Sequence, residues 1–275
     1  MFINLKGELQ SVTIPIVMGI VNCTDDSFYD GGKYLDDRAF LYRAAQLLDD
    51  GATIIDIGAV STRPDAHNID AGTEYGIIKK RVRLLLSHFP NTKISIDTFR
   101  AQIAEMAIGE GAAMVNDISG GEDPKMFSTI GKLKVPYCLT HNSRNKKISI
   151  EQLIPEILSF FGMQIEQLKM QGVNDIIIDP GFGFGKTLEQ NYFLLNNLAV
   201  FQQLGFPVLV GISRKSMIYK LLETTPDKAL TGTIVLNTIA LEQGVQILRV
   251  HDAKEAIETI KISQKLKEWQ YSKIK

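Results

Sequence analysis

The amino-acid sequence predicts an α/β fold of the (β/α)8 type, a TIM barrel, with eight parallel strands inside a ring of outer helices. One unit recurs, in which a helix-period segment ends at a glycine and is followed by four to six apolar or β-branched residues and a polar residue. The apolar runs hardly alternate with polar residues, which is typical of parallel strands covered on both faces. Eight such runs alternate with amphipathic segments within 275 residues, the number and spacing of a barrel. A doubly wound open sheet is the structural alternative.

The strands are predicted where these apolar runs lie. Five of the runs follow a glycine at the position expected for the C-terminal cap of the preceding helix, and three lack that glycine. In chain order the candidates are residues 16–21, 51–58, 93–96, 111–116, 135–139, 172–179, 205–211 and 244–249.

The helices are predicted from apolar residues repeating every three to four positions. Residues 37–49 place Phe40, Ala44, Leu47 and Leu48 on one face. Residues 150–171 form a longer amphipathic segment of the same kind, with apolar residues aligned from Ile154 to Leu168. Strands separated by such helices join as parallel neighbours.

The chain shows no linker, low-complexity stretch or second domain. We therefore expect one domain over residues 1–275, with a barrel core of about residues 14–267. The first dozen residues are expected to form a short strand or hairpin that closes the bottom of the barrel.

Composition excludes several classes of function. A net charge of −1 provides no basic surface for nucleic acid. The two cysteines, Cys23 and Cys138, lack metal-ligand spacing, and their scarcity fits a reducing compartment. The apolar run at 14–21 is too short to span a bilayer, and it lacks the features of a signal peptide. We expect a cytoplasmic protein without membrane contact.

Polar residues recur where the predicted strands end, which is the edge that carries the active site in a barrel. Seven of the eight ends have a hydrogen-bonding or charged side chain, and independent helix caps or turns would not recur at the same end of every strand. The residues are Asn22, Gly58 with Ser61, Thr62 and Arg63 beyond it, Asp97, Asn116, His141, Asp179, Ser213 with Arg214 and Lys215, and Arg249 with His251. Taken singly, Asp97 could cap a helix, Asn116 and Asp117 could form a turn, and Arg249 and Asp252 could form a salt bridge at the rim.

The side-chain types divide this ring into two regions. The carboxylates of Asp97 and Asp179 and the amide of Asn116 suit a flat heterocycle with several N–H donors and a carbonyl. Cationic donors further along the chain suit phosphate or carboxylate oxygens, and these are Lys215, Arg249 and His251. The ring therefore predicts a ligand with a heterocycle at one end and an anion at the other.

The beginning of the ring has features of a divalent-metal site. Asn22 and the acidic residues Asp25 and Asp26 could reach an ion held mainly by phosphate oxygens, as Mg²⁺ commonly is. The long loops 22–33 and 59–74 follow the first two strands and are candidates for lids over the site.

Residues 176–187 contain three glycines before Lys186 and Thr187, in the manner of a phosphate-binding loop. Pro180 stands where the Walker spacing requires the first glycine, so the match fails. We therefore expect the glycines to serve backbone geometry, with Asp179 as the ligand-binding residue and with Phe184 and Lys186 beside the pocket.

Seven motifs in order along nearly the whole chain resemble those of the dihydropteroate synthases. They are residues 18–32, 61–64, 95–98, 116–118, 178–186, 211–215 and 249–252. The resemblance implies a Mg²⁺-dependent transferase of folate biosynthesis, which joins 6-hydroxymethyl-7,8-dihydropterin pyrophosphate to p-aminobenzoate and releases 7,8-dihydropteroate and pyrophosphate. It also implies a sulfonamide target and a homodimer formed through outer helices such as residues 228–243.

The resemblance assigns roles to individual residues. Asp97, Asn116, Asp179 and Lys215 would hold the pterin, and Asp97 would stabilise a cationic pterin intermediate. Asn22, Arg249 and His251 would hold the pyrophosphate, with Asn22 also a ligand of Mg²⁺, and Lys215, Arg249 and His251 would stabilise the departing charge. The p-aminobenzoate would contact Thr62, Arg63, Pro64, Phe28, Phe184, Ser213 and Lys215.

The chain departs from the family pattern in the first loop, where Asp25 replaces a proline, in the second loop around Gly58, and at Thr140, where a methionine is common. None of these changes removes a residue with an assigned role. Two alternatives stay open at this point. One is a pterin-dependent methyltransferase, and the other is a pterin-binding homologue with weak or no turnover.

Overall fold

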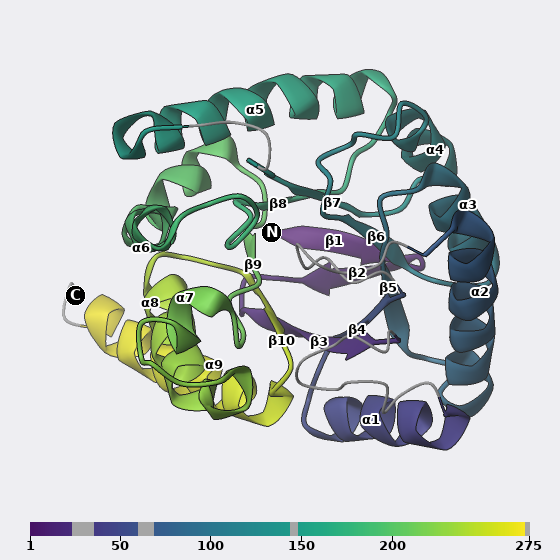
Figure 1. Ribbon diagram of the computed structural model, residues 1–275, viewed down its shortest axis with the longest axis horizontal. Helices are drawn as coiled ribbons and strands as arrows, with labels where there is room; N and C mark the ends of the chain where they lie inside the picture. The colour runs from purple at the N-terminus through teal and green to yellow at the C-terminus, as the bar shows by residue number, and fades with distance from the viewer. Residues whose placement is uncertain (24–35, 60–68, 144–147, 273–275) are drawn as a thin grey trace.

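The strands form a closed barrel. The computed structural model describes residues 1–23, 36–59, 69–143 and 148–272, with the side chains of the last helix up to Glu268 (Figure 1). Eight parallel strands form one sheet in the order β8-β7-β6-β5-β4-β3-β10-β9. Their bounds are β3 (Ile16–Asn22), β4 (Ile54–Gly58), β5 (Lys93–Asp97), β6 (Met114–Asp117), β7 (Tyr137–Thr140), β8 (Ile176–Asp179), β9 (Leu209–Val210) and β10 (Ile247–Val250).

The two edges of this sheet meet. Ile178 of β8 pairs in parallel with Val208 just before β9, and the Ile178 amide donates to the Pro207 carbonyl at 2.9 Å. Strands follow one another around the ring in chain order, without the reversal that a doubly wound sheet requires. The predicted (β/α)8 barrel is therefore confirmed, and the open-sheet alternative is wrong.

Helices surround the barrel, and those between strands make the parallel connections (Figure 1). The helix predicted at 37–49 has those bounds, and the one predicted at 150–171 ends one residue earlier. The helices are α1 (Asp37–Asp49), α2 (Ala71–His88), α3 (Ala101–Gly109), α4 (Met126–Leu133), α5 (Ile150–Met170), α6 (Leu188–Asn196), α7 (Ser216–Tyr219), α8 (Leu230–Glu242) and α9 (Ala253–Ser272), with short 3-10 segments at Leu198–Leu204 and Pro226–Lys228. None of the helices in the described ranges has the length and apolar character needed to cross a membrane.

The glycines that lead into five of the strands end the preceding helical segments as predicted. Gly51 after α1 has φ +96° and Gly172 after α5 has φ +79°, both in the left-handed region that a side chain disfavours. These residues turn the chain from the outer ring back into the barrel.

Alternation along each strand divides the core into two clusters. Ile55, Ile57, Ile94 and Ile96 point outward and pack with the helices in the larger cluster. Inward-facing residues from β3, β4, β6, β7, β8, β9 and β10 form a smaller apolar cluster at the amino ends of the strands: Ile16, Met18, Ile54, Met114, Cys138, Ile177, Leu209 and Ile247. This second cluster, which we call the plug layer, fills the lower half of the barrel.

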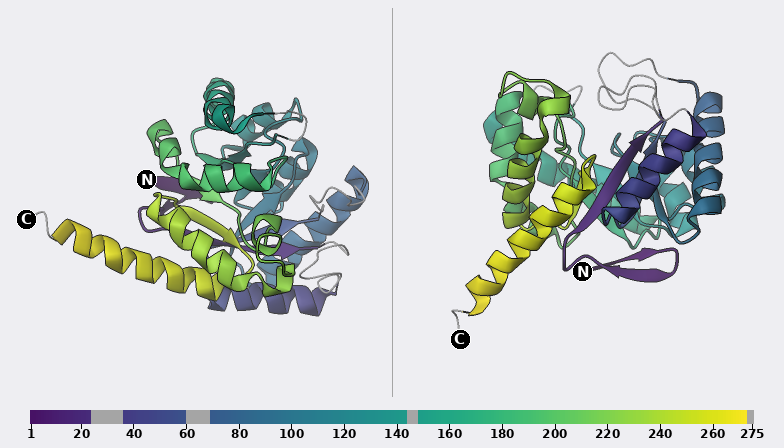
Figure 2. Two further views of the ribbon diagram at one scale, coloured as in Figure 1. Left: turned by 60° about the vertical axis from the view of Figure 1, so that its left-hand side comes forward. Right: turned by 90° about the horizontal axis from the view of Figure 1, so that it is seen from below.

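A hairpin seals the amino end of the barrel. The strands β1 (Phe2–Leu5) and β2 (Glu8–Ser11) pair antiparallel, and Ile3, Leu5 and Val12 are buried against the plug layer. Seen from the side, the hairpin lies below the barrel and the arrow of β3 points away from it (Figure 2). The predicted closure of the barrel bottom is confirmed.

Candidate active site

The candidate site lies one step above the plug layer, towards the carboxyl ends of the strands. Because side chains on a strand alternate, the next inward position is two residues further along. On four strands that position carries Asp56, Asn116, Asp179 or Arg249, and Asp97 joins them from β5. Each of the three aspartates and Asn116 is at most 8% exposed. The inner surface of the barrel therefore changes from apolar to strongly polar over two residues of these strands.

Arg249 is the centre of this polar layer. Its Nε donates to Asp56 Oδ2 at 2.6 Å, and its Nη2 donates to Asp97 Oδ2 at 2.6 Å. The same oxygen of Asp56 accepts from Asn116 Nδ2 at 3.2 Å. Arg249 Nη1 donates to no residue in the described ranges, so one face of the guanidinium remains available to an anion.

Burial dominates the electrostatics of the layer. It raises the pKa of Asp97 to about 7, against the lowering effect of Arg249, while the negative charge of Asp56 raises this pKa further. Burial alone would lower the pKa of Arg249, but the carboxylates of Asp56 and Asp97 outweigh it and hold that pKa above its ordinary value. The guanidinium therefore stays charged, whereas the charge of Asp97 changes near neutral pH.

Asp179 and Lys215 form the opposite part of the site. Asp179 Oδ1 accepts from the Gly181 amide at 2.8 Å, and burial raises the pKa of this carboxyl while Lys215 opposes the effect. Lys215 donates to the carbonyl of Phe182, and its ammonium lies 4.4 Å from the centre of the Phe184 ring. Burial lowers the pKa of Lys215 to about 8, against the raising effect of Asp179. A cation, a carboxylate and an aromatic face thus meet at one place.

The glycine loop serves backbone geometry, as expected from its failed Walker spacing. Gly181 has φ +75°, and a Cβ on this residue would lie 1.9 Å from the carbonyl oxygen of His141. Lys186 is buried and donates to the Gly181 carbonyl at 2.8 Å, and it lies 3.1 Å from His141 Nδ1. Phe184 lies beside the site as expected, whereas Lys186 ties the loop to the end of β7.

Ser213 and His251 come together at the ends of β9 and β10. Ser213 Oγ lies 3.0 Å from His251 Nδ1 and accepts from the His251 amide at 3.2 Å. The neighbouring Arg214 has φ +56° and forms a two-point ion pair with Asp252 at 2.7 and 2.8 Å. The salt bridge considered between Arg249 and Asp252 is therefore wrong, because Asp252 pairs with Arg214 and stabilises its left-handed backbone.

Of the two other ordinary roles considered, the helix cap at Asp97 is wrong, whereas the turn at Asn116 and Asp117 is confirmed for Asp117 alone. The amide of Ala101 at the start of α3 donates to Asp123, so Asp97 does not cap this helix. The turn after β6 is held by Asp117, which accepts from Ser119 and from the hydroxyl of Tyr137. Asn116 is left to face the barrel interior.

Some predicted residues cannot be placed. Phe28, Thr62, Arg63 and Pro64 lie outside the described residues. Asn22 ends β3 and is partly buried at the mouth. Within the described ranges, no group of three His, Cys, Asp or Glu side chains could hold a metal ion. The amide oxygen of Asn22 is a hard donor suited to Mg²⁺, and a single such donor fits an ion whose other ligands are phosphate oxygens and water.

Asp56 belongs to the polar layer but is absent from the residues predicted at the strand ends, because the last residue of β4 is Gly58. The inward position two residues after the plug-layer residue Ile54 identifies Asp56.

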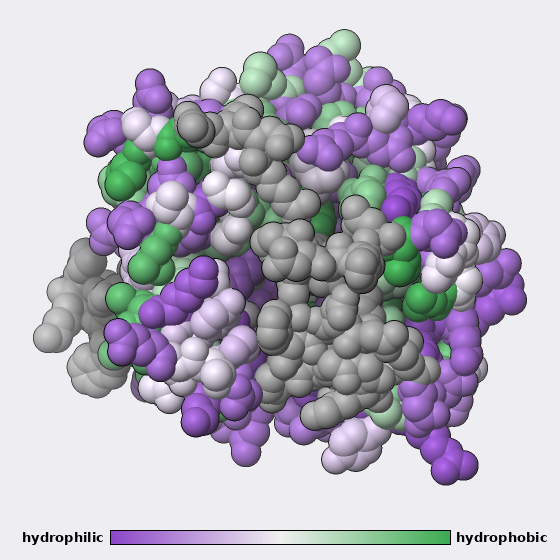
Figure 3. All heavy atoms as spheres, viewed as in Figure 1, coloured by the Kyte–Doolittle hydropathy of each residue, from purple (hydrophilic) through white to green (hydrophobic). Residues whose placement is uncertain are grey.

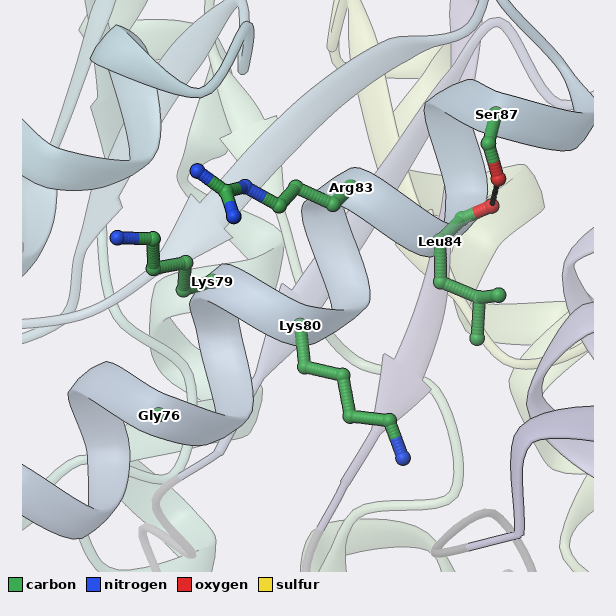
Figure 4. A pocket seen from close by; sticks show the side chains of 6 residues that line it. All are labelled: Gly76, Lys79, Lys80, Arg83, Leu84 and Ser87. Atoms are coloured by element: carbon green, nitrogen blue, oxygen red, sulfur yellow. Dashed lines mark hydrogen bonds between the residues drawn. The ribbon is translucent and has the colours of Figure 1, made fainter.

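A groove on the outer face of α2 contrasts with this site (Figure 4). It is lined by Gly76, Lys79, Lys80, Arg83, Leu84 and Ser87. Its cations already have partners, since Lys79 and Arg83 pair with Glu110 and Lys80 pairs with Asp37. The groove therefore provides no unpaired charge for a ligand.

Comparison with known proteins identifies the family. Residues 18–251 match the pterin binding enzyme family. The dihydropteroate synthase of Bacillus subtilis is 39% identical over 244 residues, which cover 87% of this chain and 84% of that protein. The crystal structure of the Yersinia pestis dihydropteroate synthase with a sulfonamide drug superposes with a TM-score of 0.93 at 36% identity, covering 98% of this chain and 100% of that one. A Coxiella burnetii dihydropteroate synthase in complex with pteroic acid gives a TM-score of 0.90 at 33% identity, covering 96% and 98%. The chain therefore belongs to the pterin-binding enzyme family, the family of the dihydropteroate synthases.

Proposed function

We propose that this chain is a dihydropteroate synthase, which condenses 6-hydroxymethyl-7,8-dihydropterin pyrophosphate with p-aminobenzoate to form 7,8-dihydropteroate and pyrophosphate in folate biosynthesis. The observation that carries the proposal is the polar layer of Asp97, Asn116, Asp179 and Arg249 above an apolar plug. The similarity to synthases that bind a sulfonamide or pteroic acid supports the same reaction.

The pterin is proposed to lie on Asp97, Asn116, Asp179 and Lys215. Asn116 Oδ1 is buried without a partner in the described ranges, so it is ready to accept an N–H of the ring. One oxygen of Asp179 is held by Gly181, which leaves the other for the ligand. Lys215 uses one of its three N–H groups on Phe182 and has donors left for the ring carbonyl.

The pyrophosphate is proposed to lie on Asn22, Arg249 and His251. The Nη1 group of Arg249 can donate to a phosphate oxygen while Nε and Nη2 stay on the carboxylates. Mg²⁺, with Asn22 as its protein ligand, would neutralise charge on the pyrophosphate when bound. The p-aminobenzoate is proposed to contact Thr62, Arg63, Pro64, Phe28, Phe184, Ser213 and Lys215, and this subsite makes the protein a sulfonamide target.

The proposed chemistry is a substitution at the CH₂ group of the pterin. The C–O bond breaks and its electron pair leaves with the pyrophosphate, so positive charge develops on the pterin, where the Asp97 carboxylate stabilises it. The neutral amine of p-aminobenzoate then forms the new C–N bond, and the nitrogen loses its proton to water. Because an aniline nitrogen attacks unprotonated, the site needs no strong base, and the Asp97 carboxylate held by Arg249 can act by charge alone.

Pyrophosphate release tests this proposal. The protein should release pyrophosphate when both substrates and Mg²⁺ are present, and release should stop when p-aminobenzoate is omitted. Calorimetric binding of the pterin substrate without any release would instead support a pterin-binding homologue. A pterin-dependent methyltransferase would release no pyrophosphate and would transfer a methyl group from a folate.

We also propose a homodimer formed through α8. This helix also carries apolar residues on its solvent-facing side, where Val235 is 51% exposed and Ile239, one turn later, is 40% exposed. Leu221 and Leu222 lie exposed after α7, and hydrophobic residues gather along the left edge of the face in Figure 3, where α6, α7 and α8 lie. Val235→Glu should convert a dimer to a monomer in sedimentation experiments, with Lys265→Glu on α9 as the control.

A cytoplasmic location is also part of the proposal, supported by two free, buried cysteines.

A further inference from the structure

Asp56 is a buried carboxylate to which the proposed reaction assigns no role. Its side chain is 0% exposed, and it lies on the inner face of β4 in register with Ser95 of β5. An ionised carboxylate at such a place is costly unless it is paired and hydrogen-bonded. The groups that it contacts therefore indicate what it contributes.

One oxygen of Asp56 makes both of its contacts. Oδ2 accepts from Arg249 Nε at 2.6 Å and from Asn116 Nδ2 at 3.2 Å, whereas Oδ1 is buried without a partner among the described residues. The two partners come from strands on opposite sides of β4 in the sheet order. Asp56 thus connects a residue assigned to the pterin with one assigned to the pyrophosphate.

The contact with Asn116 fixes the direction of its amide. If the amide were reversed, its oxygen would face the Asp56 carboxylate, and two acceptors would repel each other. With Nδ2 on Asp56, Asn116 Oδ1 is left as a buried acceptor without a donor among the described residues, so it can accept an N–H of the ligand.

The contact with Arg249 divides the guanidinium between two carboxylates. Nε lies on Asp56 and Nη2 on Asp97, so the planar group is held at two corners with Nη1 directed elsewhere. Without Asp56, Arg249 would keep Asp97 as its only anionic partner in the layer and would be free to rotate about that single contact.

We infer that Asp56 is a positioning residue, which orients the Asn116 amide as an acceptor for the pterin and holds Arg249 for the pyrophosphate. This inference rests on the proposed function. Asp56 acts through its two partners and needs no contact with the reacting atoms.

A reciprocal exchange tests the Asn116 half of the inference. Asn116→Asp alone places two carboxylates together and should lower kcat/KM about 100-fold. Adding Asp56→Asn restores one donor and one acceptor in exchanged positions, so the double variant should regain at least about tenfold over Asn116→Asp. A double variant no more active than Asn116→Asp would overturn the inference, even if Asp56→Asn by itself fails to fold.

A double-mutant cycle tests the Arg249 half. Asp56→Asn and Arg249→Lys should each lower kcat/KM, and their combination should cost far less than the product of the two effects, because both disturb one contact. Asp117→Asn is the matched control, since Asp117 is an equally buried carboxylate on the outward side of β6, bonded to Tyr137. In the Asp117→Asn/Arg249→Lys double variant, the fold-reductions in kcat/KM of the two single variants should multiply.

The outcomes separate this inference from the proposed function. Failure of the unmodified protein to release pyrophosphate would remove the proposed function. An active unmodified protein whose Asp56→Asn variant keeps its kcat/KM, or combines multiplicatively with Arg249→Lys, would instead overturn the positioning role alone.

Discussion

Replacing Gly181 by alanine should introduce two separate costs in stability, namely left-handed backbone strain and a clash of the added Cβ with a neighbouring loop. The residue has φ +75°, and a Cβ would lie 1.9 Å from the carbonyl oxygen of His141, which is backbone and cannot rotate away. Gly172 is the matched control, because it has φ +79° with nothing within 4 Å of the same added atom. Gly172→Ala therefore reports the left-handed strain alone, and Gly181→Ala reports that strain and the clash.

The magnitudes follow from these two environments. Left-handed strain costs about 1 kcal/mol of unfolding free energy in each variant. At Gly181 the loops after β7 and β8 must also separate by about 1 Å, which adds about 2 kcal/mol in a close-packed region. The same displacement would pull the Gly181 amide from Asp179 Oδ1, now 2.8 Å away, so pterin binding should weaken about tenfold or more.

Urea denaturation of both variants measures the first effect, and calorimetry with 6-hydroxymethyl-7,8-dihydropterin pyrophosphate measures the second. Gly172→Ala should bind the pterin substrate normally. If the two variants lost equal stability and bound this substrate equally well, the close approach of Gly181 to His141 would have no part in placing Asp179.

Three further predictions concern single groups of the site. Asp97→Asn should lower kcat about 100-fold or more while the calorimetric affinity for the pterin substrate changes less than tenfold, because the carboxylate acts on charge that develops during the reaction. An unchanged kcat would remove Asp97 from this role. In the unmodified protein, kcat/KM should fall about tenfold per pH unit below an apparent pKa of about 7, since protonation removes the Asp97 charge, and a pH-independent kcat/KM between pH 5 and 8 would contradict this. Thr140→Val should raise the free energy of unfolding of the ligand-free protein by about 1 kcal/mol, because Thr140 Oγ1 is buried without a partner in the described ranges, and a loss of stability in urea would show that this hydroxyl is satisfied.

The fold could be predicted from sequence because its signals are local. The apolar runs and the glycines before them mark strands and helix ends, and a strand of the structure overlaps each predicted run. The site could be predicted only in part, because the end of a strand is visible in sequence whereas the pairing of side chains across the barrel is not. Asp56 and Arg249 lie 193 positions apart and meet only when β3 pairs with both β4 and β10.

Arg214 and Lys186 show the same limit. Arg214 follows a strand end like a ligand-binding residue, yet its guanidinium is taken up by Asp252 and by carbonyls of the turn at Pro226. Lys186 occupies a phosphate-binding position in the motif, yet its ammonium holds Gly181. The chemistry of a lysine or arginine is evident in sequence, but its role depends on which acceptors lie within reach.

The sealed amino end of the barrel determines the direction from which ligands enter the site. With Ile3 and Leu5 packed under the plug layer, the described residues close the amino end of the barrel, so a ligand reaches the polar layer from the carboxyl ends of the strands. A ligand on Asp97 and Asn116 lies at the floor, below one that reaches Ser213 and His251 at the strand ends. Two reactants that share one entrance cannot overtake each other. In the proposed reaction the pterin substrate therefore binds before p-aminobenzoate, and the barrel itself imposes this order of binding.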